Sequence, residues 1–272
     1  MALPASFKQH GFVSSVNVRP ARSLMLSLEG VRDTGKTEFS LGAPGPGIVL
    51  CLDRGFDAVL DNADPPPTRR DDFGFKVIKV PKLTSATQDQ FKQYWVDYRT
   101  SLYAALDNLD ARTVVMDGDS DSWELQRLAA FGKLAKVPPY LYDEVNAARR
   151  ALYARCYDSG KIVIATNKVK KQYIDKVDDR GKVIMGADGK AESVWTGEYE
   201  RQGFRDQTYV WAVELRCLYE PDRNGDHRHG VQVISCKANM SMRGMKFWGD
   251  ECNFETVMSA LYPNVLPEDW GY

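Results

Sequence analysis

Short apolar runs alternate with amphipathic stretches through the first 170 residues. Each run is only four to six residues long, which is typical of a buried strand rather than a helix. The four runs are Ser23–Leu28, Ile48–Leu52, Thr113–Met116 and Ile162–Ala165. Between them, apolar positions recur every three or four residues over Gln90–Leu109, and Tyr142–Tyr157 has a helical pattern that closes at Ser159 and Gly160. This alternation predicts an α/β fold with a mostly parallel sheet and helices on its faces.

The pattern changes after residue 170. Val183–Trp195 contains a glycine turn at 186–189 between short extended pieces, which predicts a hairpin. Apolar and polar side chains alternate from Tyr209 to Tyr219, with Glu214 and Arg216 on the polar face, and Val231–Cys236 adds another strand. We therefore expect C-terminal antiparallel strands, at about 170–236, to extend the sheet.

One domain accounts for most of this organisation. We expect an N-terminal arm at 1–22, an α/β domain at 23–250 and a C-terminal tail at 251–272. The segment Pro65–Asp72 is rich in proline and charge and is expected to be a surface loop.

Composition narrows the class of protein. No run approaches the length of a membrane helix, and residues 1–22 lack the apolar core of a secretory leader. The 36 basic and 37 acidic side chains exclude a uniformly basic nucleic-acid binder. The five cysteines are scattered and form no C-x-x-C pair, which favours free thiols and a cytoplasmic location.

The segment 30–37 carries the strongest motif and fits G-x-x-x-x-G-K-[ST] at every position. Its residues are Gly30, Val31, Arg32, Asp33, Thr34, Gly35, Lys36 and Thr37. The two glycines let the backbone curl so that its N–H groups point at a phosphate, and the following helix adds its positive end. Lys36 supplies a cation for the terminal phosphates, and the Thr37 hydroxyl can bind Mg²⁺. The motif predicts a bound nucleotide together with Mg²⁺.

Polar residues at the ends of neighbouring strands complete the predicted site. Asp117 follows the Thr113–Met116 strand, where a carboxylate can reach Mg²⁺, and is the favoured metal residue. Asn167 follows the next strand and is a candidate sensor of the terminal phosphate or the attacking water, with a strand-end turn residue as the alternative. Asp53, Asp57 and Asp119 are candidates to orient water, and the residues do not choose among them.

The order of these segments resembles the RecA-type P-loop ATPase core, and most closely the compact phage-encoded AAA-family ATPases. The resemblance covers roughly Leu24 to Cys236 and is carried mainly by the phosphate loop, and then by Asp117. It implies a RecA-like fold, ATP, Mg²⁺, single-stranded DNA, self-association into an oligomer and a single-strand binding protein as a further partner. Its activity would be annealing or recombination in the cytoplasm of a phage host. One feature departs from the family: RecA-type proteins carry a glutamate base after the second strand, and Leu52–Asp57 has none. Asp53 or Asp57 would have to substitute, or hydrolysis is slow.

A basic segment follows Asn167, where RecA-like folds present a DNA-facing loop. Its candidate DNA contacts are Lys168, Lys170, Lys171 and Tyr173. Lysines contact phosphates and aromatic rings stack on bases, so the combination suits single strands. The alternative is a solvated hairpin, because acidic residues dilute the charge, and Trp195 beside the hairpin turn is the one tryptophan that suggests a ligand platform.

Two other polar groups stay open at this stage. Lys237, Arg243 and Lys246 would reach a neighbouring subunit's nucleotide, contact DNA or lie in an ordinary exposed loop. His227 and His229 form an H-x-H pair without a nearby cysteine or third ligand, which weighs against a metal site.

The prediction is thus a Mg²⁺-dependent ATPase that acts on single-stranded DNA in phage recombination or replication. One alternative is a small-molecule kinase, which would need an arginine-rich lid where the chain has only the scattered Arg149, Arg150 and Arg155. The other is an assembly or loader protein that uses bound nucleotide as a structural pin with little turnover.

Overall fold

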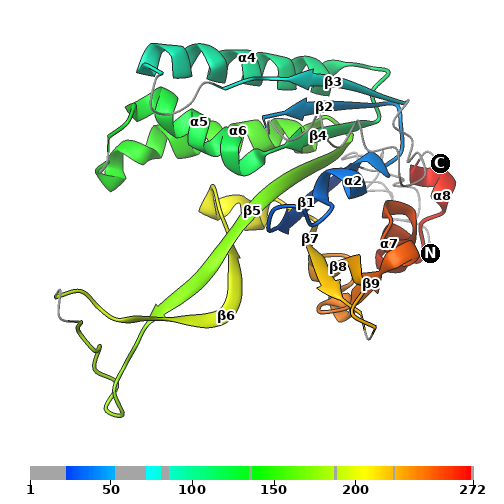
Figure 1. Ribbon diagram of the computed structural model, residues 1–272. Helices are drawn as coiled ribbons and strands as arrows, with labels where there is room; N and C mark the ends of the chain where they lie inside the picture. The colour runs from blue at the N-terminus through cyan, green and yellow to red at the C-terminus, as the bar shows by residue number, and fades with distance from the viewer. Residues whose placement is uncertain are drawn as a thin grey trace, which may run out of the picture.

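The computed structural model describes residues 23–52, 72–80, 86–134, 137–186, 189–222 and 224–270. These residues form a nine-stranded sheet in the order β3-β2-β4-β5-β1-β7-β8-β9, with β6 paired to β5 alone (Figure 1). The strands are β1 Leu24–Gly30, β2 Gly47–Cys51, β3 Phe73–Val77, β4 Thr113–Asp117, β5 Ile162–Asp175, β6 Ser193–Arg201, β7 Val213–Pro221, β8 His227–Cys236 and β9 Lys246–Trp248.

In this spatial order, the first six strands (β3, β2, β4, β5, β1 and β7) run parallel to one another. β8, β9 and β6 pair antiparallel with their neighbours. The predicted fold class is therefore confirmed: a mostly parallel sheet is flanked by helices and extended by antiparallel strands. β5 lies between β1, which leads into the phosphate loop, and β4, which ends at the predicted metal residue. This order brings the phosphate loop and the predicted metal residue to the two sides of β5.

Helices cover both faces of the sheet (Figure 1). Those described are α2 Lys36–Leu41, α4 Gln88–Asp107, α5 Asp119–Phe131, α6 Tyr142–Asp158, α7 Phe254–Leu261 and α8 Pro267–Trp270, with short 3₁₀ turns at Pro139–Leu141, Arg205–Tyr209, Met240–Met242 and Gly249–Glu251. One buried cluster joins the sheet to α4, α5 and α6, and a second joins its other face to α2, α7 and α8. Successive strand side chains point to opposite faces, so alternate residues of each strand contribute to different clusters.

Local sequence explains where α4 begins and ends. Thr87 and Gln90 form a reciprocal capping box at its start, which satisfies two backbone N–H groups. Phe91, Tyr98 and Leu102 point into the core at the predicted spacing. The predicted last apolar position of the helix, Leu109, is wrong, because the helix ends at Asp107 and Leu109 is 98% exposed.

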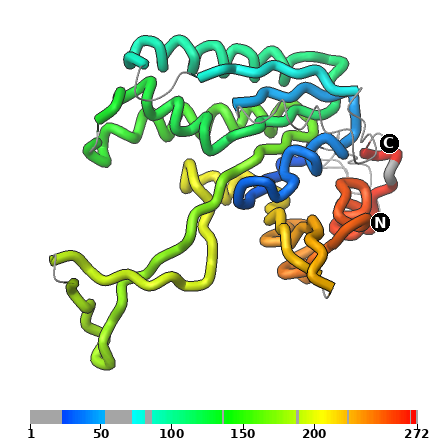
Figure 2. Tube along the Cα trace, in the orientation of Figure 1, coloured from blue at the N-terminus to red at the C-terminus, as the bar shows by residue number. Residues whose placement is uncertain are grey.

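The strand predicted to end at Ala165 is much longer. β5 continues to Asp175, and its distal half pairs with β6 as a two-stranded ribbon that projects from the sheet (Figures 1 and 2). The residues expected in a DNA-facing loop therefore lie on a strand. At the far end, the predicted hairpin turn is confirmed, since the Gly189 N–H donates to the Gly186 carbonyl over 3.0 Å.

Two further expectations need correction. The alternating segment from Tyr209 to Tyr219 becomes a strand only at Val213, because Tyr209 ends a 3₁₀ turn. That strand, β7, runs parallel to β1, so it belongs to the parallel sheet, and on this side of the sheet antiparallel pairing begins with β8. Trp211 is fully buried, although it lies just before the strand.

The structure describes much more of the C-terminal end of the chain than of the N-terminal end. The segment expected as an N-terminal arm, 1–22, and residues 65–71 of the expected loop lie outside the described residues. The segment expected as a tail, 251–272, contains α7, whose Phe254, Val257 and Leu261 are buried in the core on the α2 face. Within the part of the chain that the structure describes, no helix combines the length and apolarity needed to cross a membrane.

Candidate functional site

The loop between β1 and α2 needs both of its motif glycines. Gly35 has a φ of 81°, in the left-handed region that glycine adopts without strain. A Cβ on Gly30 would lie 2.6 Å from the Thr34 hydroxyl and 3.0 Å from the Cys217 carbonyl, so a side chain there would clash. Thr34 closes the turn by donating to the Val31 carbonyl over 3.0 Å. The sequence motif thus folds as a tight loop at the carboxyl end of β1.

The Lys36 ammonium lies against the inside of this loop. Its Nζ donates to the Val31 carbonyl over 2.6 Å and to the Gly30 carbonyl over 3.2 Å. Arg32 and Asp33 are exposed at the tip, where they form an ion pair at 3.4 Å. The loop therefore holds a cation beside the backbone N–H groups at the start of α2, an arrangement suited to a phosphate.

A carboxylate and a hydroxyl meet beside the loop. The Thr37 hydroxyl is 3.3 Å from both carboxylate oxygens of Asp117, which is only 4% exposed. The two residues come from different elements, the first turn of α2 and the end of β4. No group of three or more histidine, cysteine, aspartate or glutamate residues that could hold a metal occurs among the described residues. A cation at Thr37 and Asp117 would therefore draw further oxygens from its ligand or from water, as Mg²⁺ does in nucleotide sites.

Two residues that the sequence analysis did not single out hold Asp117 in place. The Thr166 hydroxyl donates to Asp117 Oδ1 over 2.7 Å and accepts the Gly118 N–H over 2.8 Å. The Cys51 thiol lies 3.5 Å from Asp117 Oδ2. A buried carboxylate with several donors is fixed in orientation, which suits a metal ligand.

The predicted sensor, Asn167, lies on the other face of the sheet. Its side-chain amide donates to the Ser27 hydroxyl over 3.0 Å, and its oxygen accepts from Ser120 over 3.3 Å. The preceding residue, Thr166, is the one whose side chain reaches Asp117. Adjacent residues of a strand point to opposite faces of the sheet. The sequence therefore locates the polar end of this strand, but the side chain on the phosphate-loop face is that of Thr166 and not that of Asn167.

The structure separates the candidate water-orienting residues. Asp53 and Asp57 lie outside the described residues. Asp119 is buried and bound by the Arg149 guanidinium at 2.5 Å and the Tyr153 hydroxyl at 2.7 Å. Both partners lie on α6, which covers the face opposite α2, so Asp119 stabilises the packing of α5 on α6 rather than facing the phosphate loop.

The candidate DNA residues lie along the ribbon of β5 and β6. Lys168 pairs with Asp121 at 2.7 Å and Lys170 with Glu200 at 2.9 Å. Lys171 lies 4.7 Å from the centre of the Trp195 ring, and Tyr173 is 56% exposed. The ribbon thus presents aromatic and aliphatic surface, while acidic neighbours offset part of its positive charge.

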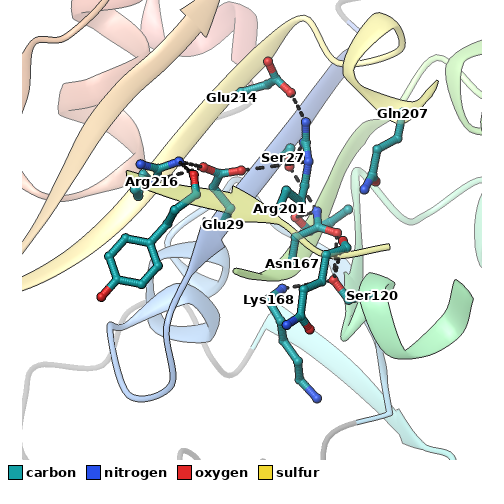
Figure 3. A network of polar contacts seen from close by, with 12 residues as sticks. Ser27, Glu29, Ser120, Asn167, Lys168, Arg201, Gln207, Glu214 and Arg216 are labelled. Carbon is teal, nitrogen blue, oxygen red and sulfur yellow. Dashed lines mark hydrogen bonds and ion pairs between the residues drawn. The ribbon is translucent and has the colours of Figure 1, made fainter. Parts of the chain in front are cut away.

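A nearly buried ionic network joins the base of the ribbon to the phosphate-loop strand (Figure 3). Glu29, directly before Gly30, accepts two bonds from Arg216 at 2.6 and 2.8 Å. Arg216 also donates to the Tyr199 carbonyl of β6 over 3.0 Å. Arg201, at the end of β6, pairs with Glu214 at 2.5 Å and donates to Ser27 over 2.8 Å. Alternation along β7 showed that Glu214 and Arg216 share a face, but their partners lie far away in sequence.

The C-terminal basic positions have different surroundings. Lys237 donates to the Tyr209 carbonyl over 2.7 Å, Lys246 is 3.8 Å from Glu220, and Arg243 is exposed. Their action on a neighbouring subunit, like oligomerisation itself, stays a prediction.

Comparison with known proteins gives structural similarity without a relative in sequence. No family model and no curated protein matches the sequence. Among solved structures, the chain is similar to a KaiC-like protein from the hyperthermophilic archaeon Pyrococcus horikoshii OT3, with 14% identity, 82% of this chain and 83% of that chain covered, and a TM-score of 0.43. The assignment of the fold therefore rests on the strand order itself.

Proposed function

We propose that this chain binds ATP with Mg²⁺ and hydrolyses it. The observation that carries the proposal is the meeting of Thr37 and Asp117, 3.3 Å apart, beside a complete phosphate loop. Thr37, at the end of the phosphate loop, and Asp117 are 80 residues apart in sequence, and a RecA-like strand order brings them to one edge of the sheet. Ligands of open α/β sheets bind beyond the carboxyl ends of the strands, which is where these groups lie.

Each group has a defined role in this proposal. The loop N–H groups and Lys36 bind the phosphates, and Lys36 exchanges its carbonyl contacts for phosphate oxygens. Thr37 and Asp117 hold Mg²⁺, which when bound offsets negative charge on the phosphates. Thr166 keeps the carboxylate aimed at that position. Asp53 or Asp57 remains our candidate to orient water.

The positions of the arginines favour this reading over a small-molecule kinase. Arg149 is buried against Asp119, Arg150 pairs with Asp206 at 3.0 Å, and Arg155 pairs with Asp107 at 2.6 Å. All three lie on α6, on the face of the sheet opposite α2. They are therefore committed to contacts away from the loop and do not form a lid over it.

The test is a titration of the full chain with ATP, with and without Mg²⁺, followed by an assay of phosphate release. We expect Mg²⁺ to tighten ATP binding in the wild type, and Lys36→Ala to abolish binding. Asp117→Asn should weaken binding chiefly when Mg²⁺ is present. Tight binding without phosphate release would favour the nucleotide-pinned assembly protein, and transfer of phosphate to a small molecule would favour the kinase.

We further propose that single-stranded DNA is the partner of the ribbon, in a recombination or annealing role like that of the phage ATPases. The supporting observation is the exposed pairing of Lys171 with Trp195, close to the exposed Tyr173. Rings stack on bases of any sequence, and a lysine beside them contacts the phosphates. Because residues 168–201 contain eight basic and seven acidic side chains, stacking has to supply much of the affinity.

Anisotropy of a labelled single-stranded oligonucleotide tests this partner. Trp195→Ala should weaken binding about tenfold, since stacking contributes roughly 1–3 kcal/mol per base. The control is Tyr140→Ala, because the Tyr140 side chain is exposed. Trp123→Ala would not serve, because the Trp123 ring packs on the Phe204 ring with their centres 5.1 Å apart. Equal affinity of wild type and Trp195→Ala would remove the ribbon from the DNA site.

A further inference from the structure

Three aromatic rings form a row beside the phosphate loop, on β7, which pairs with β1, and on β8, which pairs with β7. Tyr219 of β7 lies directly opposite His229 of β8 in the antiparallel register. The Tyr219 ring centre is 4.7 Å from that of His229 and 4.8 Å from that of His227, with which it is stacked. The two histidines are those of the H-x-H pair, so here they are part of a ring cluster with a tyrosine.

The row lies on the face of the sheet that carries α2. Cys217 and Val231, two residues from Tyr219 and His229, are buried in the cluster that contains Phe39 of α2. Side chains two residues apart on a strand share a face, so the rings point to the same side as Thr37, Asp117 and the phosphate loop.

The row also lies at the correct edge and in contact with the loop. β7 is parallel to β1 with Glu29 opposite Arg216, so Tyr219 extends about 6–7 Å beyond the level of Gly30. A Cβ placed on Gly35 would come within 3.1 Å of His229 Nδ1. The imidazole therefore packs against the residue that precedes Lys36.

The rings are available to a ligand. Tyr219 is 49% exposed, and both histidines are exposed. Exposed flat rings next to a phosphate-binding loop provide what the other end of a nucleotide requires, a surface on which a base can stack.

We propose that His227, Tyr219 and His229 form the platform on which the base of the bound nucleotide stacks. The inference rests on the proposed nucleotide site and adds the position and chemistry of its base subsite. Because the platform offers π faces, it selects for a large aromatic base and discriminates weakly between purines. We expect ATP and GTP to bind with similar affinity and CTP to bind more weakly.

Calorimetric titration of ATP and of inorganic tripolyphosphate into the full chain separates the base from the phosphates. We expect Tyr219→Ala to weaken ATP binding about tenfold and to leave tripolyphosphate affinity within about twofold of wild type. The control is Tyr157→Ala, since Tyr157 is 61% exposed on α6, and it should change neither affinity. His229→Phe keeps a flat ring without ring nitrogens and should retain ATP affinity within about threefold.

A stacking-sensitive probe gives an independent readout. The fluorescence of 2-aminopurine riboside triphosphate should be quenched on binding to wild type and much less on binding to Tyr219→Ala. Unchanged ATP affinity in Tyr219→Ala would overturn the platform, as would equal losses of ATP and tripolyphosphate in any of these variants. If the wild type bound neither ligand, the nucleotide site itself would fail, which is a different result from failure of the platform alone.

Discussion

At the scale of single residues, the Thr166 hydroxyl is the contact on which the geometry of Asp117 depends. It donates to the Asp117 carboxylate and accepts the Gly118 N–H, so its removal takes one hydrogen bond away from each of these two buried groups. We expect Thr166→Val to lower the free energy of unfolding by about 1–3 kcal/mol and to weaken Mg²⁺-dependent ATP binding. Urea unfolding and ATP titration check the two effects.

The conservative variant distinguishes the hydroxyl from the shape of the side chain. Thr166→Ser keeps both hydrogen bonds and should restore Mg²⁺-dependent binding. If Thr166→Val bound Mg²⁺ and ATP like the wild type, Asp117 would not depend on this contact.

Thr166 and its neighbour Asn167 show how much of the site could be predicted from the sequence. The phosphate loop and Asp117 were recognised because their chemistry is encoded in consecutive residues and in the end of an apolar run. The choice between Thr166 and Asn167 depends on which face of the sheet each side chain occupies, and both are polar. Only the position of α2 relative to the strand decides it, and that position is a tertiary property.

At the scale of elements, the ion pairs that anchor the ribbon differ in burial and therefore in energy. Arg201 and Glu214 have side chains 9% and 10% exposed, so removal of the cation leaves a carboxylate with little solvent. We expect Arg201→Met to destabilise the fold by about 3 kcal/mol. Lys170→Met removes a half-exposed pair on the same ribbon and should cost less than about 1 kcal/mol.

Urea unfolding of both variants measures this difference. Arg201→Met combined with Glu214→Leu should recover most of the loss, because it removes the unpaired charge. Equal stability of Arg201→Met and Lys170→Met would show that burial does not set the energy of these pairs.

The sequence predicts the buried strands and α4 better than it predicts where they end, since α4 ends at Asp107 rather than Leu109 and β7 begins at Val213 rather than Tyr209. The buried strands appear as apolar runs, and α4 shows its 3.6-residue period. The distal half of β5 has neither signal, because both faces of the ribbon are largely exposed from Lys168 to Asp175. Without a buried face, polar and apolar residues need not alternate, so the sequence pattern gives no sign of a strand there.

At the scale of the whole molecule, buried thiols link stability to pH. Burial raises the pKa of Cys156 and of Cys217 from 9.0 to about 12. Both thiols then stay protonated in the folded state while they ionise in the unfolded state, so stability is full below pH 9 and falls up to about pH 12. Each contributes a slope of about 1.4 kcal/mol per pH unit in that window.

Chemical denaturation between pH 8 and 10.5 measures this slope. Cys156→Ala should lower the free energy of unfolding through the cavity it leaves. It should also reduce the slope of that free energy against pH by about 1.4 kcal/mol per pH unit, the contribution of one proton. An unchanged slope in Cys156→Ala would mean that this thiol ionises equally in both states.

The fold also connects the phosphate loop to the ribbon along two routes. β5 passes from Thr166, which holds Asp117, directly into the ribbon, and Glu29 reaches the Tyr199 carbonyl of β6 through Arg216. Under the proposed function, we expect a ligand that shifts the loop to act on the base of the ribbon, and by reciprocity we expect a ligand on the ribbon to act on the loop. We expect the affinity for single-stranded DNA to differ at least about fivefold between the nucleotide-free protein and its complex with a non-hydrolysable ATP analogue.

Glu29→Gln keeps the shape of the side chain and removes the charge that holds Arg216, so the difference in DNA affinity should shrink in this variant. Lys76→Met, which breaks an exposed pair with Asp97 beside α4, is the matched control and should leave the difference intact. Oligonucleotide anisotropy without nucleotide, with ADP and with the analogue measures all three proteins. Equal DNA affinity in the three nucleotide states of the wild type would mean that the ionic network only supports the ribbon, since coupling requires that each ligand distinguish the two states of the other site.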